Sequence, residues 1–422
     1  MTEDFLQYIW QYSLYLPEGN LTGEGEPVET LLAGQPNAHA GPDFTDARVR
    51  IGDTLWAGCV EIHLRSSDWE RHGHHLDPAY NSVVLHAVYQ RDADTYNARR
   101  QKVPVMELHF DARYYDNYTR LTGSKTHIAC RDEPDKADRL SLALWLERLA
   151  IERLEQKTGA LMQTYAATGG NWEETLYQRL ARSFGFSLNA LPFESLARSL
   201  PLNILLKHRD HLQQLEALLF GQAGLLDSAD AADGYCTELR REYLHLRKKY
   251  GLTPIDRFLW KFLRLRPVNF PTLRIAQFAA LIHRNGRLFS QIIEAKSMAD
   301  FEKIFDLQAS PYWDTHYVFG RDSLRRKKSF AAVSIRTVLI NTVVPFLFAY
   351  GKLHGADEFC THAVGLLESL PPEKNSILAS WEELGVHQPN ALASQALLQL
   401  AGEYCRPRRC LSCVIGNRIV RK

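Results

Sequence analysis

Two acidic residues and a histidine near the N-terminus have spacings that suit metal chemistry. Asp43 enters a β-rich segment after Pro42, and Glu61 follows eighteen residues later. Alternate side chains of a strand share a face, so Glu61 and His63 should point to one side and Ile62 to the other. If the two strands pair, the carboxylates of Asp43 and Glu61 meet, and like charges at close range are costly unless a cation lies between them. Hard carboxylate oxygens favour Mg²⁺ or Mn²⁺, so these two residues are the expected metal ligands.

An alternative interpretation of the same residues needs no metal. Glu61 and His63 would then form a polar pair at a sheet edge, and Asp43 would cap a turn after Pro42. The two interpretations differ in whether the carboxylates of Asp43 and Glu61 converge in the folded chain.

Histidines form a second set of potential ligands in the same segment. Within residues 63–86 the sequence contains His63, His72, His74, His75, His86, Asp68 and Asp77. Imidazole with carboxylate is also the ligand set for zinc or non-haem iron, and a barrel of the cupin type presents such ligands on neighbouring strands. His86 would approach His63 if their strands are neighbours. The histidines at 72–75 fall in a loop rich in Arg and Gly, where exposed histidines are expected.

Three cysteines near the C-terminus form another cluster. They are Cys405, Cys410 and Cys413, flanked by Arg406, Arg408 and Arg409. Thiolates at this spacing bind zinc or an iron–sulfur cluster, and adjacent arginines favour the thiolate form. Three ligands are one short of a closed tetrahedral site, and Cys130 is the expected fourth, with Cys360 or His362 as alternatives. The metal-free alternative is a set of reduced, partly buried thiols.

The elements that must position these residues change in character along the chain. Alternating β-branched and aromatic residues predict four strands, at 44–51, 55–64, 82–89 and 103–110. Helices are expected at 1–16 and 24–32 and as a short helix beginning at Asp77. Beyond Thr126 long helical patterns dominate, such as 140–161 and 171–184. We therefore predict an α+β fold, with an α/β domain at 1–125 and a mostly helical domain at 126–422.

Charge and composition limit the kinds of partner and the cell location that we expect for this chain. Residues 1–125 hold 11 Lys and Arg against 18 Asp and Glu, whereas the rest of the chain holds 39 against 31. A basic helical part fits nucleic acid as a polyanionic partner, and equally a solvated surface without one. There is no basic leader and no run of about 18 apolar residues, so a cytoplasmic protein without a membrane span is expected. No glycine-rich phosphate loop or Gly-x-Ser-x-Gly elbow occurs, which disfavours nucleotide hydrolysis and serine esterase chemistry.

About 90 of the 422 residues resemble the core of the PD-(D/E)XK nucleases. That family has an Asp in one strand, Glu-x-Lys in the next and a preceding helix that often bears a Glu. The resemblance assigns Glu26 to the helix, Asp43 and Glu61 to the strands, and His63 to the place of the Lys. It implies a restriction-endonuclease-like core in which these four residues are catalytic. A metal would polarise the scissile phosphate, and His63 would orient the attacking water, with a charge only near or below its ordinary pKa of about 6.5.

The resemblance extends to the cysteines, because some nucleases of this group hold a cluster on one upstream cysteine and three near the C-terminus. A narrower resemblance rests on the strings GPDF, WAGCVEIH, SSDW, HGHH and YNSVVLH. They are similar to the start of an uncharacterised bacterial family that we expect to span the whole chain.

These observations lead to one main functional hypothesis. The protein is expected to be a metal-dependent, nuclease-like phosphodiesterase whose basic helical part holds nucleic acid. The alternatives are a module of the same fold that binds nucleic acid or protein without chemistry, and a histidine-based metalloenzyme.

Overall fold

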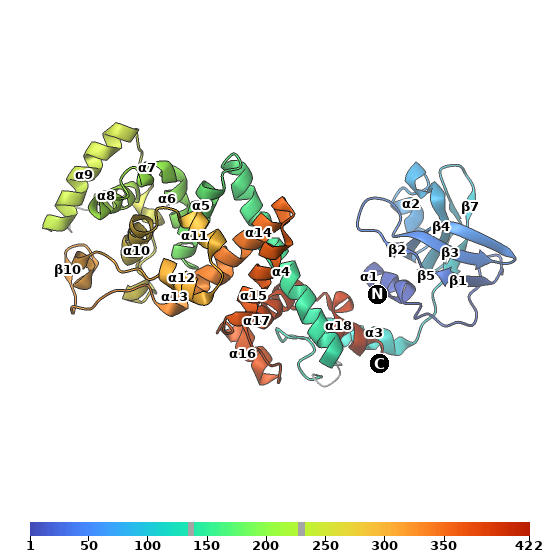
Figure 1. Ribbon diagram of the computed structural model, residues 1–422. Helices are drawn as coiled ribbons and strands as arrows, with labels where there is room; N and C mark the ends of the chain where they lie inside the picture. The colour runs from blue at the N-terminus through green and yellow to red at the C-terminus, as the bar shows by residue number, and fades with distance from the viewer. Residues whose placement is uncertain (134–138, 227–232) are drawn as a thin grey trace. The chain divides into compact units, whose positions relative to one another are not determined.

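The chain folds into two compact units. The computed structural model describes residues 1–133, 139–226 and 233–422. The sheet unit comprises Met1–Trp145 and Leu400–Lys422, and the helical unit comprises Leu146–Gln399 (Figure 1). The predicted α+β class is confirmed, because the mixed sheet lies in the N-terminal part and helices dominate the rest. The predicted boundary near residue 125 falls inside the sheet unit, and the division into 1–125 and 126–422 stays a prediction.

The sheet unit begins with a helix and continues through short strands and turns. Its elements up to residue 122 are α1 (Glu3–Gln11), β1 (Val28–Leu32), β2 (Gln35–Pro36), β3 (Phe44–Ile51), β4 (Thr54–Arg65), α2 (Asp68–Arg71), η1 (Pro78–Ser82), β5 (Val83–Gln90), β6 (Thr95–Tyr96), β7 (Lys102–Val103), β8 (Val105–Glu107) and α3 (Ala112–Thr122). The sheet has the order β1-β3-β4-β5-β8, and β2 pairs with β3 outside this path. The pairs β1–β3 and β3–β4 are antiparallel, whereas β4–β5 and β5–β8 are parallel.

The alternation of β4 separates its apolar and polar residues. Val60 and Ile62 pack in the main core of the sheet unit, whereas Glu61 and His63 lie on the other face of the strand. Both faces are covered, so all four residues are buried. The β3–β4 hairpin turns at Gly52, whose φ of +57° suits the first position of a two-residue turn.

The expected helix at 24–32 is wrong, because this segment contains strand β1. Val28 pairs with Ile51 and Thr30 with Val49, so backbone N–H and C=O groups of β1 form hydrogen bonds with β3. Two features oppose a helix here: Gly25 adopts a φ of +84°, and Val28 and Thr30 are β-branched residues that favour a strand. The error moves Glu26 out of a helix and into the loop before β1.

The C-terminal residues return to the sheet unit. They form η8 (Leu400–Cys405), a π-helical turn, then η9 (Cys410–Ser412) and α18 (Val414–Val420). Figure 1 shows α18 beside α3, and the Asn117 side-chain amide donates to the carbonyl of Val420 at 3.4 Å. The tail also contacts α1, where the Tyr8 hydroxyl donates to the carbonyl of Asn417 at 3.2 Å.

Helices of varied length build the helical unit. They are the C-terminal part of α4 (Arg139–Ala167), α5 (Trp172–Phe184), α6 (Ala190–Ser199), α7 (Leu202–Leu206), α8 (Leu212–Gln222), α9 (Gly234–Tyr250), η4 (Arg257–Leu259), η5 (Pro267–Asn269), α10 (Pro271–Arg284), α11 (Leu288–Glu294), α12 (Met298–Ile304), η6 (Pro311–Asp314), α13 (Ala332–Val338), η7 (Leu339–Val343), α14 (Val344–His354), α15 (Asp357–Ser369), α16 (Ser376–Glu383) and α17 (Ala391–Gln399). One small hairpin, β9 (His316–Val318) with β10 (Arg321–Asp322), interrupts them. A single large apolar core spans most of these helices.

One long apolar helical segment of the described chain is the continuous run of α13, η7 and α14. These 23 residues, Ala332–His354, are long and apolar enough to cross a membrane, and 72% of their most apolar window is buried inside the protein. A core helix of a helical domain has the same properties. The run contains a π-helical turn, Leu339–Val343, which places Asn341 and Thr342 beside a pocket considered below.

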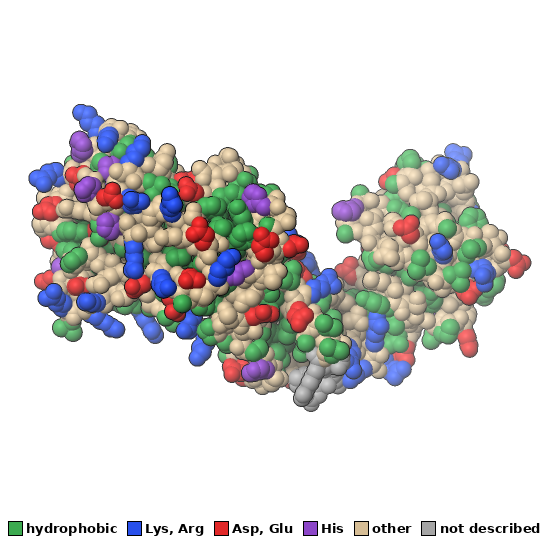
Figure 2. All heavy atoms as spheres, viewed as in Figure 1, with side chains coloured by type: hydrophobic (Ala, Val, Ile, Leu, Met, Phe, Trp, Pro, Cys, Tyr) green, Lys and Arg blue, Asp and Glu red, His purple; other side chains and the backbone are tan. Residues whose placement is uncertain are grey.

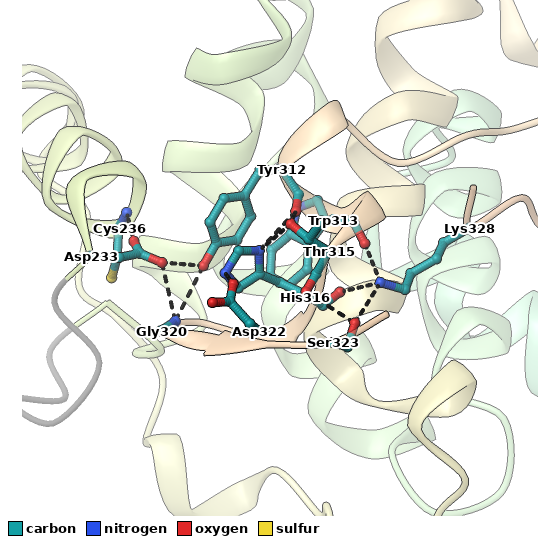
Figure 3. Close-up of polar contacts among 10 residues, drawn as sticks. All are labelled: Asp233, Cys236, Tyr312, Trp313, Thr315, His316, Gly320, Asp322, Ser323 and Lys328. Carbon is teal, nitrogen blue, oxygen red and sulfur yellow. Dashed lines mark hydrogen bonds and ion pairs between the residues drawn. The ribbon is translucent and has the colours of Figure 1, made fainter. Parts of the chain in front are cut away.

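Polar side chains fix the β9–β10 hairpin to the surrounding helices (Figure 3). Asp233 caps α9 and accepts hydrogen bonds from the Tyr312 hydroxyl and the Gly320 N–H. The buried ammonium of Lys328 donates to the carbonyls of Trp313 and His316. A buried cation that donates to backbone carbonyls in this way is a structural anchor.

A buried carboxyl group on α8 makes the stability of the helical unit depend on pH. Glu216 is fully buried and accepts hydrogen bonds from the hydroxyls of Tyr235 and Ser310. Burial raises the pKa of Glu216 to about 7. Because the folded pKa lies above the unfolded one, this group stabilises the fold fully below pH 4.5, and the contribution is lost as the pH rises through about 7.

The substitution Glu216→Gln removes the ionisation and should therefore help more at high pH. The free energy of unfolding of the variant minus that of the wild type should be about 2–3 kcal/mol larger at pH 8 than at pH 4. Urea unfolding at both pH values measures the difference. The exposed Glu302→Gln is the control and should show no such change; an equal effect of Glu216→Gln at the two pH values would contradict the assignment.

Candidate metal centre

Three neighbouring strands bring the polar side chains of the sheet unit together. Asp43 immediately precedes β3, Glu61 and His63 lie on β4, and His86 lies on β5. The parallel register pairs Glu61 with His86, so their side chains emerge side by side on the same face. The prediction that His86 approaches His63 is confirmed, since His63 Nδ1 lies 2.9 Å from His86 Nε2.

Backbone and side-chain hydrogen bonds hold Asp43 against Glu61. The N–H of Asp43 donates to Glu61 Oε2 at 3.0 Å, and the N–H of Ile62 donates to Asp43 Oδ2 at 2.9 Å. Asp43 Oδ1 accepts from the side-chain amide of Gln7 at 2.9 Å. Burial, and then the charge of Glu61, raise the pKa of Asp43 to about 7. The charge of Glu61 therefore disfavours the ionised form of Asp43.

Histidines occupy the other side of Glu61. Glu61 Oε1 lies 3.3 Å from His74 Nε2 and 3.5 Å from His63 Nε2. His63 Nε2 in turn lies 3.1 Å from His72 Nδ1. His74 Nε2 is buried and makes no hydrogen bond within the described structure, although it is close to the carboxylate oxygen. Glu61 Oε1 therefore lies close to one nitrogen of His74 and one of His63, and the His74 nitrogen donates no hydrogen bond to it.

The expectation that the loop histidines are exposed is wrong for His74. The helix α2 and Gly73, whose φ is +78°, turn the chain back over the sheet, and the N–H of His74 donates to the carbonyl of Trp69 at 3.0 Å. The His74 ring stacks on Tyr80 with centroids 3.7 Å apart and is only 8% exposed. The buried ring of Trp69 packs against His86 and so holds this loop on the sheet face that carries His86. His72 itself remains exposed.

Burial changes the protonation of the central histidine. Burial, together with His74, His72 and Arg71, lowers the pKa of His63 to about 3. The pKa of His86 is also far below its ordinary value, because the ring is fully buried. His63 is therefore neutral at pH 7 and cannot supply the positive charge of a lysine. A neutral imidazole is, however, the form that binds a metal.

The donor set fits a divalent transition metal. In the described part of the chain, one group of three potential ligands has its donor atoms within 4.8 Å of one another, and it consists of His63, His72 and His74. Nitrogens bound to one zinc ion at about 2.0–2.1 Å lie about 3.3 Å apart, which matches the separations around Glu61 Oε1 and His63 Nε2. Binding through His63 Nε2 places its proton on Nδ1, where His86 Nε2 can accept it.

Residues of the first helix also face the centre, and the sequence did not single them out. Gln7 contacts Asp43, and Glu3, one turn earlier on α1, has its pKa raised by burial against the lowering effect of His72. Their i, i+4 spacing on a helix buried on most sides is the signal that could have identified them. Glu26, in contrast, lies beside Gly52 at the opposite end of β3 from Asp43, so the structure does not bring it to the centre.

The four predicted cysteine ligands lie in the sheet unit. Cys130 follows α3, and Cys405, Cys410 and Cys413 lie on the C-terminal turns η8, η9 and the start of α18. The alternatives named for the fourth ligand, Cys360 and His362, lie on α15 of the helical unit. All the cysteines of the chain are free of disulfides.

The chain belongs to the family described as Protein of unknown function (DUF2851), whose model matches residues 3–376. The predicted membership of an uncharacterised family is confirmed to that extent. The match includes Asp43, Glu61 and the histidines of the candidate metal centre, and it ends before Cys405. No curated protein and no solved structure matches the chain.

Metal addition tests the centre directly. Mn²⁺ or Zn²⁺ should raise the melting temperature, because an ion that binds only the folded chain adds about 2.7 kcal/mol when present at 100 times its Kd. The substitutions His74→Ala and Glu61→Gln should each remove most of this gain, and thermal melting with and without the ion measures it. His75→Ala, the next histidine in the chain, is the matched control and should keep the gain. An undiminished gain in both site variants would place the ion elsewhere.

Proposed function

We propose that this member of the DUF2851 family is a metal-dependent phosphodiesterase that acts on nucleic acid and has a nuclease-like centre on the sheet unit. The observation that carries the proposal is the convergence of Asp43 and Glu61, linked by a 3.0 Å hydrogen bond, with the histidines that border Glu61. Glu61 is buried and Asp43 half-buried, the charge of Glu61 acts on the Asp43 carboxyl group, and neither has a Lys or Arg partner in the described structure, which favours a bound cation.

The order of elements supports a PD-(D/E)XK-like interpretation. A helix, a strand that begins after Asp43 and a next strand with Glu61-Ile62-His63 follow one another in space as in that pattern. The helical carboxylate assigned to Glu26 is better supplied by Glu3, because α1 packs on β4 and Glu3 lies one turn from Gln7. The proposed catalytic set is therefore Asp43, Glu61, His63 and Glu3.

His63 has a different role from the lysine of that pattern. A ring that is neutral at pH 7 and borders Glu61 acts as a metal ligand, with His72 and His74 completing the nitrogen donors. Imidazole ligands favour manganese, zinc or iron over magnesium, so Mn²⁺ is the ion that suits both the carboxylates and the histidines. A bound ion polarises the phosphate and lowers the pKa of its water. In the reaction the water oxygen bonds to phosphorus, the bond to one nucleoside oxygen breaks, and that oxygen leaves with a proton.

A basic pocket in the helical unit supports nucleic acid as the substrate. Lys157, Arg179 and Arg182 line a cavity of about 590 Å³ with Asn341 and Thr342 of the π-helical turn. Arg182 pairs with Glu194, whereas in the described part of the chain no carboxylate pairs with Arg179. A half-buried guanidinium without an acidic partner, beside amide and hydroxyl donors, fits a phosphate oxygen.

Elsewhere the charge of the helical unit is diffuse. Figure 2 shows Lys and Arg side chains spread over the visible face among Asp and Glu, without a single basic block. In the run at 321–328 Lys328 is buried, whereas Arg321, Arg325, Arg326 and Lys327 are exposed and Asp322 lies among them. We favour the pocket around Arg179 as the phosphate site, because its basic residues line a cavity.

Cleavage assays test the proposed chemistry. With Mn²⁺ the protein should hydrolyse a panel of single- and double-stranded DNA and RNA, and a chelator should abolish the activity. Asp43→Asn and Glu61→Gln should each lower kcat/KM by ~100-fold or more, because they remove ligands that position the ion. His63→Lys should also inactivate the enzyme, since a ligand is replaced by a cation.

The controls separate the alternatives. His109→Ala, an exposed histidine of the same unit, should retain full activity. Retained activity in His63→Lys would restore the lysine-like role for His63. If the protein binds nucleic acid but cleaves none with any metal, it is a binding module. If it turns over a small molecule with Zn²⁺ or Fe²⁺ and does not cleave nucleic acid, it is a histidine-based metalloenzyme.

Removal of the unpaired guanidinium tests the pocket. Arg179→Ala should weaken nucleic-acid binding by about tenfold or more and reduce its salt dependence, because one charge-assisted phosphate contact is lost. Fluorescence anisotropy at several salt concentrations measures both quantities. Arg325→Ala, in the exposed basic run, is the matched control, and a larger effect there than in Arg179→Ala would move the phosphate site to that run.

A further inference from the structure

An aromatic pocket lies in the helical unit, where η4 and the segment after it approach the β9–β10 hairpin. Its volume is about 330 Å³, at the lower end of the range of about 300–1,000 Å³ for small-ligand pockets. Four aromatic rings line it, those of Phe258, Trp260, Phe262 and Phe319. Trp260 and Phe319 are buried, whereas Phe262 is half-buried and Phe258 is 75% exposed. The pocket therefore offers the flat faces or edges of aromatic rings to a ligand from solvent.

Hydrogen bonds fix the segment that carries three of these rings. The indole N–H of Trp260 donates to the carbonyl of Ala223 at 2.8 Å. The buried Asn189 holds the backbone of the next residue, because its side-chain oxygen accepts from the N–H of Lys261 at 2.8 Å and its side-chain nitrogen donates to the Lys261 carbonyl at 2.9 Å. The segment is thus ordered before a ligand binds, which lowers the entropic cost of binding.

The same segment is basic. The Arg257 guanidinium lines the pocket and lies over the Phe258 ring, 5.2 Å from its centroid. The preceding Asp256 caps η4, where its carboxylate accepts from the N–H of Phe258 at 2.9 Å. Residues 257–270 contain no Asp or Glu and four exposed basic residues, namely Arg257, Lys261, Arg264 and Arg266. A ligand that combines a flat ring with negative charge is complementary to this surface.

A nucleotide combines these two features. Bases stack on aromatic side chains whatever their sequence, and neighbouring Lys and Arg residues contact the backbone phosphates. In a duplex each base is already stacked and paired, so a base reaches such a pocket from a single strand or after unstacking. An anionic lipid surface would instead engage apolar side chains that project from the protein, such as Leu263, which is 87% exposed and does not line the pocket. The recessed rings favour the base.

We propose that this pocket binds an unstacked base of a single-stranded nucleic acid. Phe258 and Phe262 supply the stacking surfaces, and Arg257 contacts the adjoining phosphate. The inference rests on the proposed function, because it narrows the nucleic-acid substrate to one with single-stranded segments. The pocket shares no lining residue with the cavity around Arg179, so it adds a second contact on the helical unit, one that recognises bases.

Fluorescence anisotropy of the full-length chain with a labelled thymidine oligomer of about 20 nucleotides tests the pocket. A chelator in the buffer separates binding from metal-dependent cleavage. Phe258→Leu keeps an exposed apolar side chain but removes the ring, so it should weaken binding by about tenfold, whereas Phe258→Trp should retain it. Leu263→Ala, in the same segment but outside the pocket, is the matched control and should bind like the wild type.

An abasic oligomer of the same length isolates the stacking contact, because it keeps the phosphates and lacks the bases. Phe258→Leu should bind it with wild-type affinity. Equal weakening for both oligomers, or unchanged binding of the thymidine oligomer by Phe258→Leu, would overturn the base pocket.

Two further outcomes identify which idea fails. Binding of phosphatidylserine vesicles that Leu263→Ala loses, with no binding of the oligomer by the wild type, would overturn the proposal in favour of a lipid surface. Oligomer binding that depends on the Phe258 ring, without cleavage when Mn²⁺ is supplied, would support the pocket and reject the phosphodiesterase. Cleavage of the thymidine oligomer with the same KM in the wild type and Phe258→Leu would reject the pocket and retain the phosphodiesterase.

Discussion

A buried carboxylate without a basic partner, Glu61, is the constraint on which the geometry of the sheet unit depends. It is 5% exposed, and in the described structure its neighbours are the N–H of Asp43 and the rings of His63 and His74. An isolated buried charge is costly, so the surrounding elements must supply hydrogen bonds, neutral nitrogens or a cation. Two features place neutral imidazole rings around Glu61. They are the parallel pairing of β4 with β5 and the turn of the His74 loop back onto the sheet.

The strand periodicity made the centre of this arrangement predictable. A period of two fixes which face each residue of β4 and β5 occupies, so the shared face of Glu61, His63 and His86 followed from the sequence once the strands were located. The contact between Asp43 and Glu61 needed only the antiparallel pairing of β3 with β4. Both inferences rest on local patterns, which a single sequence carries well.

Other parts of the site depend on tertiary structure and could not be predicted in this way. The local pattern of residues 24–32 fits a short helix, and only the pairing of this segment with β3 makes it a strand. The loop that carries His74 is rich in Arg and Gly, which predicts exposed histidines, yet the buried Trp69 holds the loop on the sheet. Gln7 and Glu3 belong to a helix whose docking on β4 no local pattern shows.

The C-terminal tail is physically connected to the candidate metal centre through the first helix. Cys413 begins α18, whose Asn417 accepts a hydrogen bond from Tyr8, and Arg421 after it donates to the same hydroxyl at 3.1 Å. Tyr8 lies on α1 beside Gln7, which holds Asp43. The tail thus supports α1, and α1 positions Asp43 through Gln7. The contacts form one continuous packed path from the tail to the candidate metal centre, so order in the tail and order in the centre are expected to rise together.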